Sequence, residues 1–84
     1  MARLWLSNIE EGTSDEEIRD FLVKYGFPAF DKIEHVASEG PRPGAILTFN
    51  DAPVEGLRIL KERIHDMYWK KGRLIAQVLH DDFA

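Results

Sequence analysis

Apolar and polar residues follow two different periods along this chain, and the two periods separate predicted strands from predicted helices. Short segments in which apolar and polar residues alternate indicate strands with one buried face, while apolar residues three and four positions apart indicate helices. We predict strands over residues 3–9, 32–37, 44–50 and 74–79, with the weakest pattern in the second. We predict helices between the first and second strands and between the third and fourth.

Local signals place the ends of both predicted helices. Ser14 with Glu17 three residues later forms a capping-box pattern, and Gly26 is suited to a left-handed helix end. Asp51 is a candidate N-cap for the second helix, which we expect to end near Met67 or Tyr68. We interpret residues 69–72 as a connector between this helix and the last strand.

The order strand, helix, strand, strand, helix, strand predicts an α+β fold of the ferredoxin-like βαββαβ type. Two right-handed βαβ units give a four-stranded antiparallel sheet with both helices on one face. We treat residues 1–84 as one domain with its core over about 3–80 and a short tail at 81–84. The residues expected to be buried together are Leu6, Phe21, Leu47, Phe49, Leu60, Ile64 and Val78, with Trp5 on the opposite sheet face.

Composition narrows the classes of function. The 11 Lys and Arg against 15 Asp and Glu give a formal charge of −4, which argues against binding nucleic acid by charge alone. The chain has no cysteine, so it has neither disulfides nor thiolate metal sites. No apolar run approaches a membrane span, and the first residues lack a signal-peptide pattern. We therefore expect a cytoplasmic protein with no membrane partner.

The first predicted strand contains a recognisable motif. Residues 4–9, Leu-Trp-Leu-Ser-Asn-Ile, resemble the shorter signature of the RNA recognition motif family, and all five specified positions match. The resemblance covers about residues 3–80 and implies the same fold as the pattern analysis. In that family the aromatic residue of this strand stacks on a base, a role that the resemblance assigns to Trp5.

The third predicted strand matches only half of the longer signature of that family. Over residues 42–49 the basic, small, aliphatic and buried aromatic positions are Arg42, Ala45, Leu47 and Phe49. The two outward aromatic positions are replaced by Gly44 and Ile46. The resemblance therefore implies the fold, and a binding face with one stacking aromatic in place of three.

These observations predict a module that binds single-stranded RNA weakly through its uncovered sheet face. We expect that face to include Ala37, Gly44, Ile75 and Leu79 beside the binding residues, and Phe83 in the tail could fold back over it. Lys70, Lys71 and Arg73 could hold phosphates at its edge. The candidate RNA-binding residues are Arg3, Trp5, Ser7, His35, Arg42, Ile46, Thr48, Lys70, Lys71, Arg73 and Gln77.

A second function stays open from the same residues. The expected face is more aliphatic than a typical RNA-binding sheet, and an exposed apolar patch often marks a protein interface. We therefore keep a protein–protein interaction module as the alternative. The three histidines lack metal-ligand spacing, and no phosphate loop or nucleophile–base pair is evident, so we expect no metal, no cofactor and no enzymatic activity.

Overall fold

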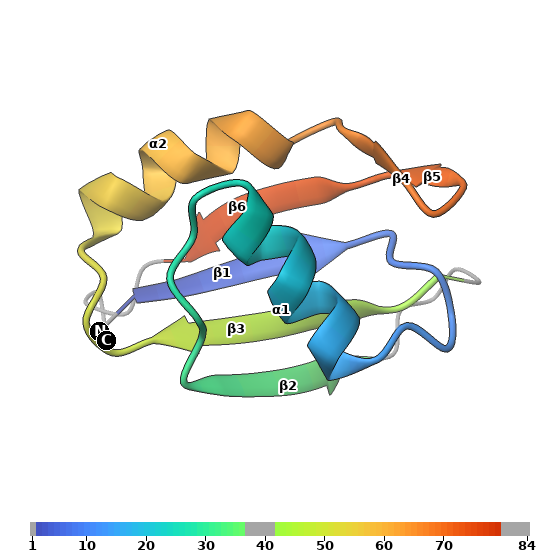
Figure 1. The fold of residues 1–84 in the computed structure, drawn as a ribbon, viewed down its shortest axis with the longest axis horizontal. Helices are drawn as coiled ribbons and strands as arrows, with labels where there is room; N and C mark the ends of the chain where they lie inside the picture. The colour runs from blue at the N-terminus through green and yellow to red at the C-terminus, as the bar shows by residue number, and fades with distance from the viewer. Residues whose placement is uncertain (1, 37–41, 80–84) are drawn as a thin grey trace.

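The structure, a computed structural model, describes residues 2–36 and 42–79 (Figure 1). Its elements follow the predicted order, with one additional hairpin before the last strand. They are β1 (Ala2–Ser7), α1 (Asp15–Lys24), β2 (Lys32–Val36), β3 (Gly44–Phe49), α2 (Val54–Ile64), β4 (Tyr68–Trp69), β5 (Gly72–Arg73) and β6 (Ile75–Leu79).

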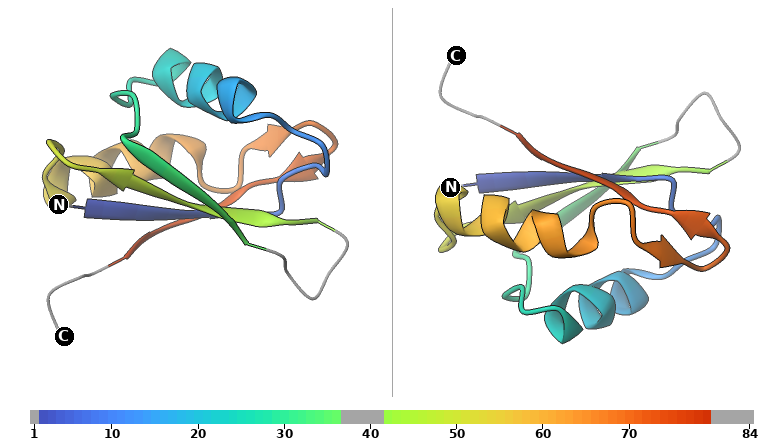
Figure 2. Two further views of the ribbon diagram at one scale, coloured as in Figure 1. Left: turned by 90° about the horizontal axis from the view of Figure 1, so that it is seen from below. Right: turned by 90° about the horizontal axis from the view of Figure 1, so that it is seen from above.

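Four strands form one antiparallel sheet in the order β2-β3-β1-β6. Both helices lie on the same side of this sheet, and the two turned views show that no described element covers the other side (Figure 2). This arrangement confirms the predicted α+β, ferredoxin-like fold. We call the uncovered side of the sheet the open face.

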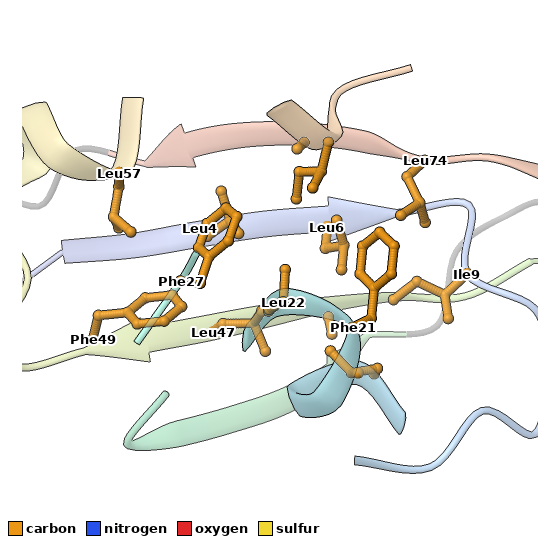
Figure 3. Packing of buried hydrophobic residues seen from close by; sticks show 14 of the residues in the cluster. Leu4, Leu6, Ile9, Phe21, Leu22, Phe27, Leu47, Phe49, Leu57 and Leu74 are labelled. Carbon is orange, nitrogen blue, oxygen red and sulfur yellow. The ribbon is translucent and has the colours of Figure 1, made fainter. Parts of the chain in front are cut away.

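The core lies between the sheet and the helices (Figure 3). Leu4 and Leu6 of β1 are fully buried in one cluster with Leu22 of α1 and Leu57 of α2. Alternation along β1 places both Leu4 and Leu6 on the helix side of the sheet. The predicted set is confirmed. Leu6, Phe21, Leu47, Phe49 and Ile64 are buried, and Leu60 and Val78 are partly buried against them.

Helix α1 has the predicted ends. The Glu17 N–H donates to Ser14 Oγ at 3.1 Å, and the Ser14 N–H donates to Glu17 Oε1 at 3.0 Å, which completes the capping box. At the other end Gly26 has a φ of 98°, and the N–H groups of Gly26 and Phe27 donate to the carbonyls of Val23 and Leu22. These two bonds form a Schellman motif, which satisfies carbonyls that the helix leaves unpaired.

Helix α2 is shorter than predicted at both ends. Its N-cap is Pro53 and not Asp51, because a residue that precedes proline disfavours the helical conformation and Ala52 holds that place. It ends at Ile64 and not near Met67. Asp66 has a φ of 66°, and its N–H donates to the Leu74 carbonyl at 2.8 Å, so the chain leaves the helix and enters the additional hairpin.

Residues 69–72, which we predicted to be a connector, belong to that hairpin. Tyr68 pairs with Arg73 and Trp69 with Gly72, around a turn at Lys70 and Lys71. The predicted positions of Ala37 on the open face and of Phe83 over it lie outside the described residues.

Candidate nucleic-acid interface

The strand register arranges the open face as three rows of side chains that each cross all four strands. The first row contains Lys32, Thr48, Arg3 and Leu79, the central row Glu34, Ile46, Trp5 and Gln77, and the third row Val36, Gly44, Ser7 and Ile75. In the third row, the pairing of Ser7 with Gly44 continues the β1–β3 register by one residue. Six of the predicted binding residues, Arg3, Trp5, Ser7, Ile46, Thr48 and Gln77, therefore lie on the open face as expected.

Trp5 is the aromatic centre of this face. It is opposite Ile46 on one side and Gln77 on the other, and its indole leans across β3. A Cβ built on Gly44 would lie 2.8 Å from Trp5 Cη2 and 3.1 Å from Trp5 Cζ2. Gly44, at a position where the family has an aromatic residue, thus leaves the space in which the Trp5 ring lies. One aromatic ring, that of Trp5, therefore covers both positions.

The rest of the open face is mainly small or aliphatic. Ile75 of β6 is 42% exposed, while Thr48 of β3 is only 8% exposed. Ile46, Val36 and Leu79 are partly buried. Each base that stacks on an aromatic side chain contributes about 1 to 3 kcal/mol. Trp5 is the one aromatic residue among the described residues of the open face, so these residues supply one such contribution.

The prediction that His35 lies on the open face is wrong. His35 pairs with Ala45, whose side is buried under the helices, and His35 Nε2 lies 2.5 Å from Asp15 Oδ1 at the start of α1. The predicted register of β2 was therefore displaced by one residue. Lys32, Glu34 and Val36 occupy the open side of this strand instead.

The β4–β5 hairpin extends beyond the third row of the face (Figure 1). Its two turn residues, Lys70 and Lys71, have φ values of 50° and 70°, as a type I′ turn requires. Such turns favour asparagine and glycine, because a left-handed conformation costs other residues about 1–2 kcal/mol each. The hairpin must therefore be held by contacts outside the turn.

Helix α1 supplies those contacts. Trp69 stacks on Phe21 with ring centroids 4.5 Å apart and an interplanar angle of 25°. The Lys70 ammonium lies 5.5 Å from the Trp69 ring centroid and donates to Glu17 Oε2. The pKa of Glu17 is lowered, mainly by this bond and then by the bond from the Ser14 N–H.

The basic residues predicted to hold phosphates are consequently not equivalent. Lys70 is paired with Glu17, whereas the side chains of Lys71 and Arg73 are exposed and make no ion pair within residues 2–36 and 42–79. Lys71 and Arg73 belong to the hairpin, which lies on the helix side of the sheet (Figure 2). Lys32 and Arg3 lie on the open face, in the first row.

Arg42, the basic position of the longer signature, lies under the hairpin. Its Nε donates to the Asn8 carbonyl at 3.1 Å and its Nη2 to the Lys70 carbonyl at 3.1 Å. A Cβ on Gly72 would lie 2.5 Å from Arg42 Nη2, so the glycine makes room for the guanidinium. Arg42 thus joins the end of β1 to the hairpin turn.

Asn8, which the candidate list omits, has a related structural role. It has a φ of 65°, a conformation that asparagine adopts more readily than most residues, and its Nδ2 donates to the Arg73 carbonyl at 2.7 Å. The signature itself was the available signal, because asparagine is a specified position in it. Asn8 and Arg42 together fix the hairpin relative to the sheet.

Other kinds of site find little support in the part of the chain that the structure describes. No group of three or more His, Cys, Asp or Glu side chains is arranged to hold a metal ion there. Within the same residues neither helix is both long and apolar enough to cross a membrane.

Comparison with known proteins identifies the fold. No family model and no curated protein sequence matches the chain. Among solved structures, Pes4 RRM3 superposes with a TM-score of 0.75 at 16% identity, over 98% of this chain and 95% of its own. The MEC-8 C-terminal RRM domain bound to AGCACA gives a TM-score of 0.68 at 13% identity, over 99% and 95% of the two chains.

The Rna15 RRM with bound RNA (GU) gives a TM-score of 0.65 at 15% identity, over 89% of this chain and 79% of its own. Identities this low establish shared architecture. The superpositions span nearly the whole chain, including the sheet in the order β2-β3-β1-β6 and both helices. The chain therefore has the fold of the RNA recognition motif domains.

Proposed function

We propose that this protein is a non-enzymatic module that binds single-stranded RNA weakly through the open face of its sheet. The observation that supports this proposal best is the position of Trp5, in the central row of a face that no described element covers. Lys32 and Arg3 lie on the same face in the first row, and Lys71 and Arg73 are exposed in the hairpin beyond the third row. Of the structures with the same fold, that of Rna15 contains bound RNA (GU) and that of MEC-8 is bound to AGCACA.

The same face explains why the affinity should be low. Gly44 and Ile46 remove two of the three stacking positions of the family, which corresponds to a loss of about 2–6 kcal/mol. The net charge of −4 adds unfavourable long-range electrostatics. Phosphate contacts from all four of these basic residues would give a slope of log affinity against log salt concentration of at most about −3 for single-stranded RNA.

The proposal is tested by titrating short single-stranded RNA pools into the labelled protein while amide chemical shifts are recorded. Shifts should move in β1, β3 and β6, and Trp5→Ala should lower the affinity about 5- to 150-fold, which corresponds to one lost stack. Trp5→Phe should restore part of the affinity. Shift changes confined to the helix side, or an unchanged affinity in Trp5→Ala, would contradict the proposal.

A matched pair of lysine variants separates local contact from net charge. Lys32→Ala and Lys24→Ala remove the same charge, but Lys32 lies in the first row and Lys24 lies on α1 near Tyr25. Only Lys32→Ala should weaken binding markedly and make the salt dependence shallower. Equal effects of the two variants would indicate attraction without a defined site.

Protein binding through the open face is the second candidate function. The specific observation in its favour is Ile75, which is 42% exposed on the edge strand β6 and shares the open face with Ile46, Val36 and Leu79. Large exposed apolar residues on a sheet face are typical of protein interfaces. Ile75→Lys should abolish binding of a protein partner, whereas it should maintain or strengthen binding of RNA.

A further inference from the structure

Glu34 is an unexpected residue on a face proposed to bind a polyanion. It is exposed, it points to the open side of β2, and it lies directly opposite Ile46 in the central row. A carboxylate at this place repels phosphate, so it weakens any binding that depends on charge alone. Hydrogen bonding to a base edge is the favourable contact that is left for it, because an ionised carboxylate accepts hydrogen bonds but cannot donate them.

The lean of Trp5 determines where a stacked base would lie. Its ring extends over β3 at Gly44, with Cη2 2.8 Å from a Cβ built there. A base on that ring therefore lies above β3, and one edge of it faces β2. Of the β2 residues on this side, Val36 is opposite Gly44 and Glu34 is one step away along the diagonal. Diagonal neighbours in a sheet are about 7–8 Å apart, a separation that a long side chain spans.

The residues at the two edges of such a base differ in what they can select. Gln77, opposite Trp5 on β6, presents both a donor and an acceptor and can adapt to any base edge. Val36 forms no hydrogen bond. Glu34 accepts only, so it favours a base edge with an amino group and disfavours one with carbonyl oxygens. Carboxylates accept from the amino group of cytosine in this way, and a well-placed contact discriminates by about 1–3 kcal/mol.

We infer that Glu34 is a specificity-determining residue, and that it selects a base with an exocyclic amino group over uracil at the position stacked on Trp5. This inference rests on the proposed RNA binding and adds a preference within it. Uracil presents one N–H between two carbonyl oxygens, both of which a carboxylate repels. Cytosine has the same ring size but presents an amino group where uracil has an oxygen, so the two pyrimidines form a matched pair of probes.

The test compares the affinities of the protein for six-nucleotide oligomers of cytidine and of uridine. The wild-type protein should favour the cytidine oligomer about tenfold. Glu34→Gln should bring the two affinities within about twofold of each other, mainly by strengthening the binding of uridine, because an amide presents both a donor and an acceptor. The readout is the ratio, which a general change in charge or stability does not alter.

Glu16→Gln is the matched control, because Glu16 is exposed on α1 and the substitution changes the net charge by the same amount. It should leave the ratio at the wild-type value. Equal wild-type affinities for the two oligomers, with binding that still depends on Trp5, would overturn the inference and leave the proposed function intact. A ratio unchanged by Glu34→Gln would also overturn it. Failure of both oligomers to bind would overturn the proposed function as well.

Discussion

The two tryptophans of this protein lie in two regions that use an aromatic ring differently. Trp5 is in the middle of the open face and covers Gly44, on the side of the sheet away from the helices. Trp69 is in the β4–β5 hairpin, where Phe21 of α1 stacks on its ring and the Lys70 ammonium lies near it. Both rings are partly buried, so fractional exposure does not distinguish them.

The difference lies in what the neighbours leave available. The ring contacts of Trp69 are made with α1 and with its own hairpin, and they hold in place a turn with two left-handed lysines. Trp5 lies over Gly44 and opposite Ile46 and Gln77, on the side of the sheet that no described element covers. Trp69 therefore contributes mainly to the stability of the fold, and Trp5 is available to a ligand.

The largest effect that would sharpen this comparison is a difference in stability between two alanine variants. Trp69→Ala should lower the free energy of unfolding by about 2–4 kcal/mol, because it removes the stack on Phe21 and releases the hairpin. Trp5→Ala should cost about 1 kcal/mol, since it uncovers Gly44 on the side of the sheet away from the core. Urea unfolding measures both values, and equal losses would remove the distinction between the two regions.

The close approach of Trp5 to Gly44 can be broken from the other side. Gly44→Ala places a Cβ within 3.0 Å of the Trp5 ring and 3.0 Å from the Leu6 carbonyl oxygen, so the indole must move. We expect a loss of about 1–3 kcal/mol, and a smaller loss when Trp5 is already alanine. A double-mutant cycle measures this coupling, and additive losses would show that the ring does not lie over the glycine.

The hairpin turn offers an effect of opposite sign. Lys71→Asn should raise the free energy of unfolding by up to about 1 kcal/mol, because asparagine tolerates the left-handed conformation better than lysine. The same variant should weaken RNA binding, with a salt slope shallower by about 0.7. Lys70→Asn should gain less stability, since it also loses the contact with Glu17. A loss of stability in Lys71→Asn would contradict the view that the left-handed backbone of Lys71 is strained.

The smallest expected effect is the pH dependence of the Glu17–Lys70 pair. The pKa of Glu17 is lowered below 4.5 in the folded protein, so its contribution to stability is present above that pH and is lost as the pH falls through the folded value. Glu17→Gln keeps a capping-box residue but removes the ion pair. Its unfolding midpoint in urea should be below that of wild type at pH 7 and converge with it in acid. Glu16→Gln, which leaves the pair of Glu17 and Lys70 in place, is the control for the loss of one charge.

The sequence by itself determined the features that depend on residues close together in the chain. The ends of α1 follow from Ser14, Glu17 and Gly26, whose hydrogen bonds reach three to five residues along the chain. The outward position of Trp5 follows from its alternation with Leu4 and Leu6, because successive side chains of a strand point to opposite faces. The order of strands and helices, and with it the fold, followed from these local patterns.

Only the tertiary structure decided the features that depend on contacts distant in sequence. The apolar residues of β2, Ile33 and Val36, are three apart, so no period of two orients this strand, and pairing with β3 determines that Glu34 and not His35 faces the open side. The turn of the β4–β5 hairpin consists of Lys70 and Lys71, which lack the usual sequence signal of a hairpin turn. The stack of Trp69 on Phe21 and the hydrogen bond from Lys70 to Glu17 hold this hairpin in place. Such contacts form only when the chain has folded, which is why local patterns did not predict them.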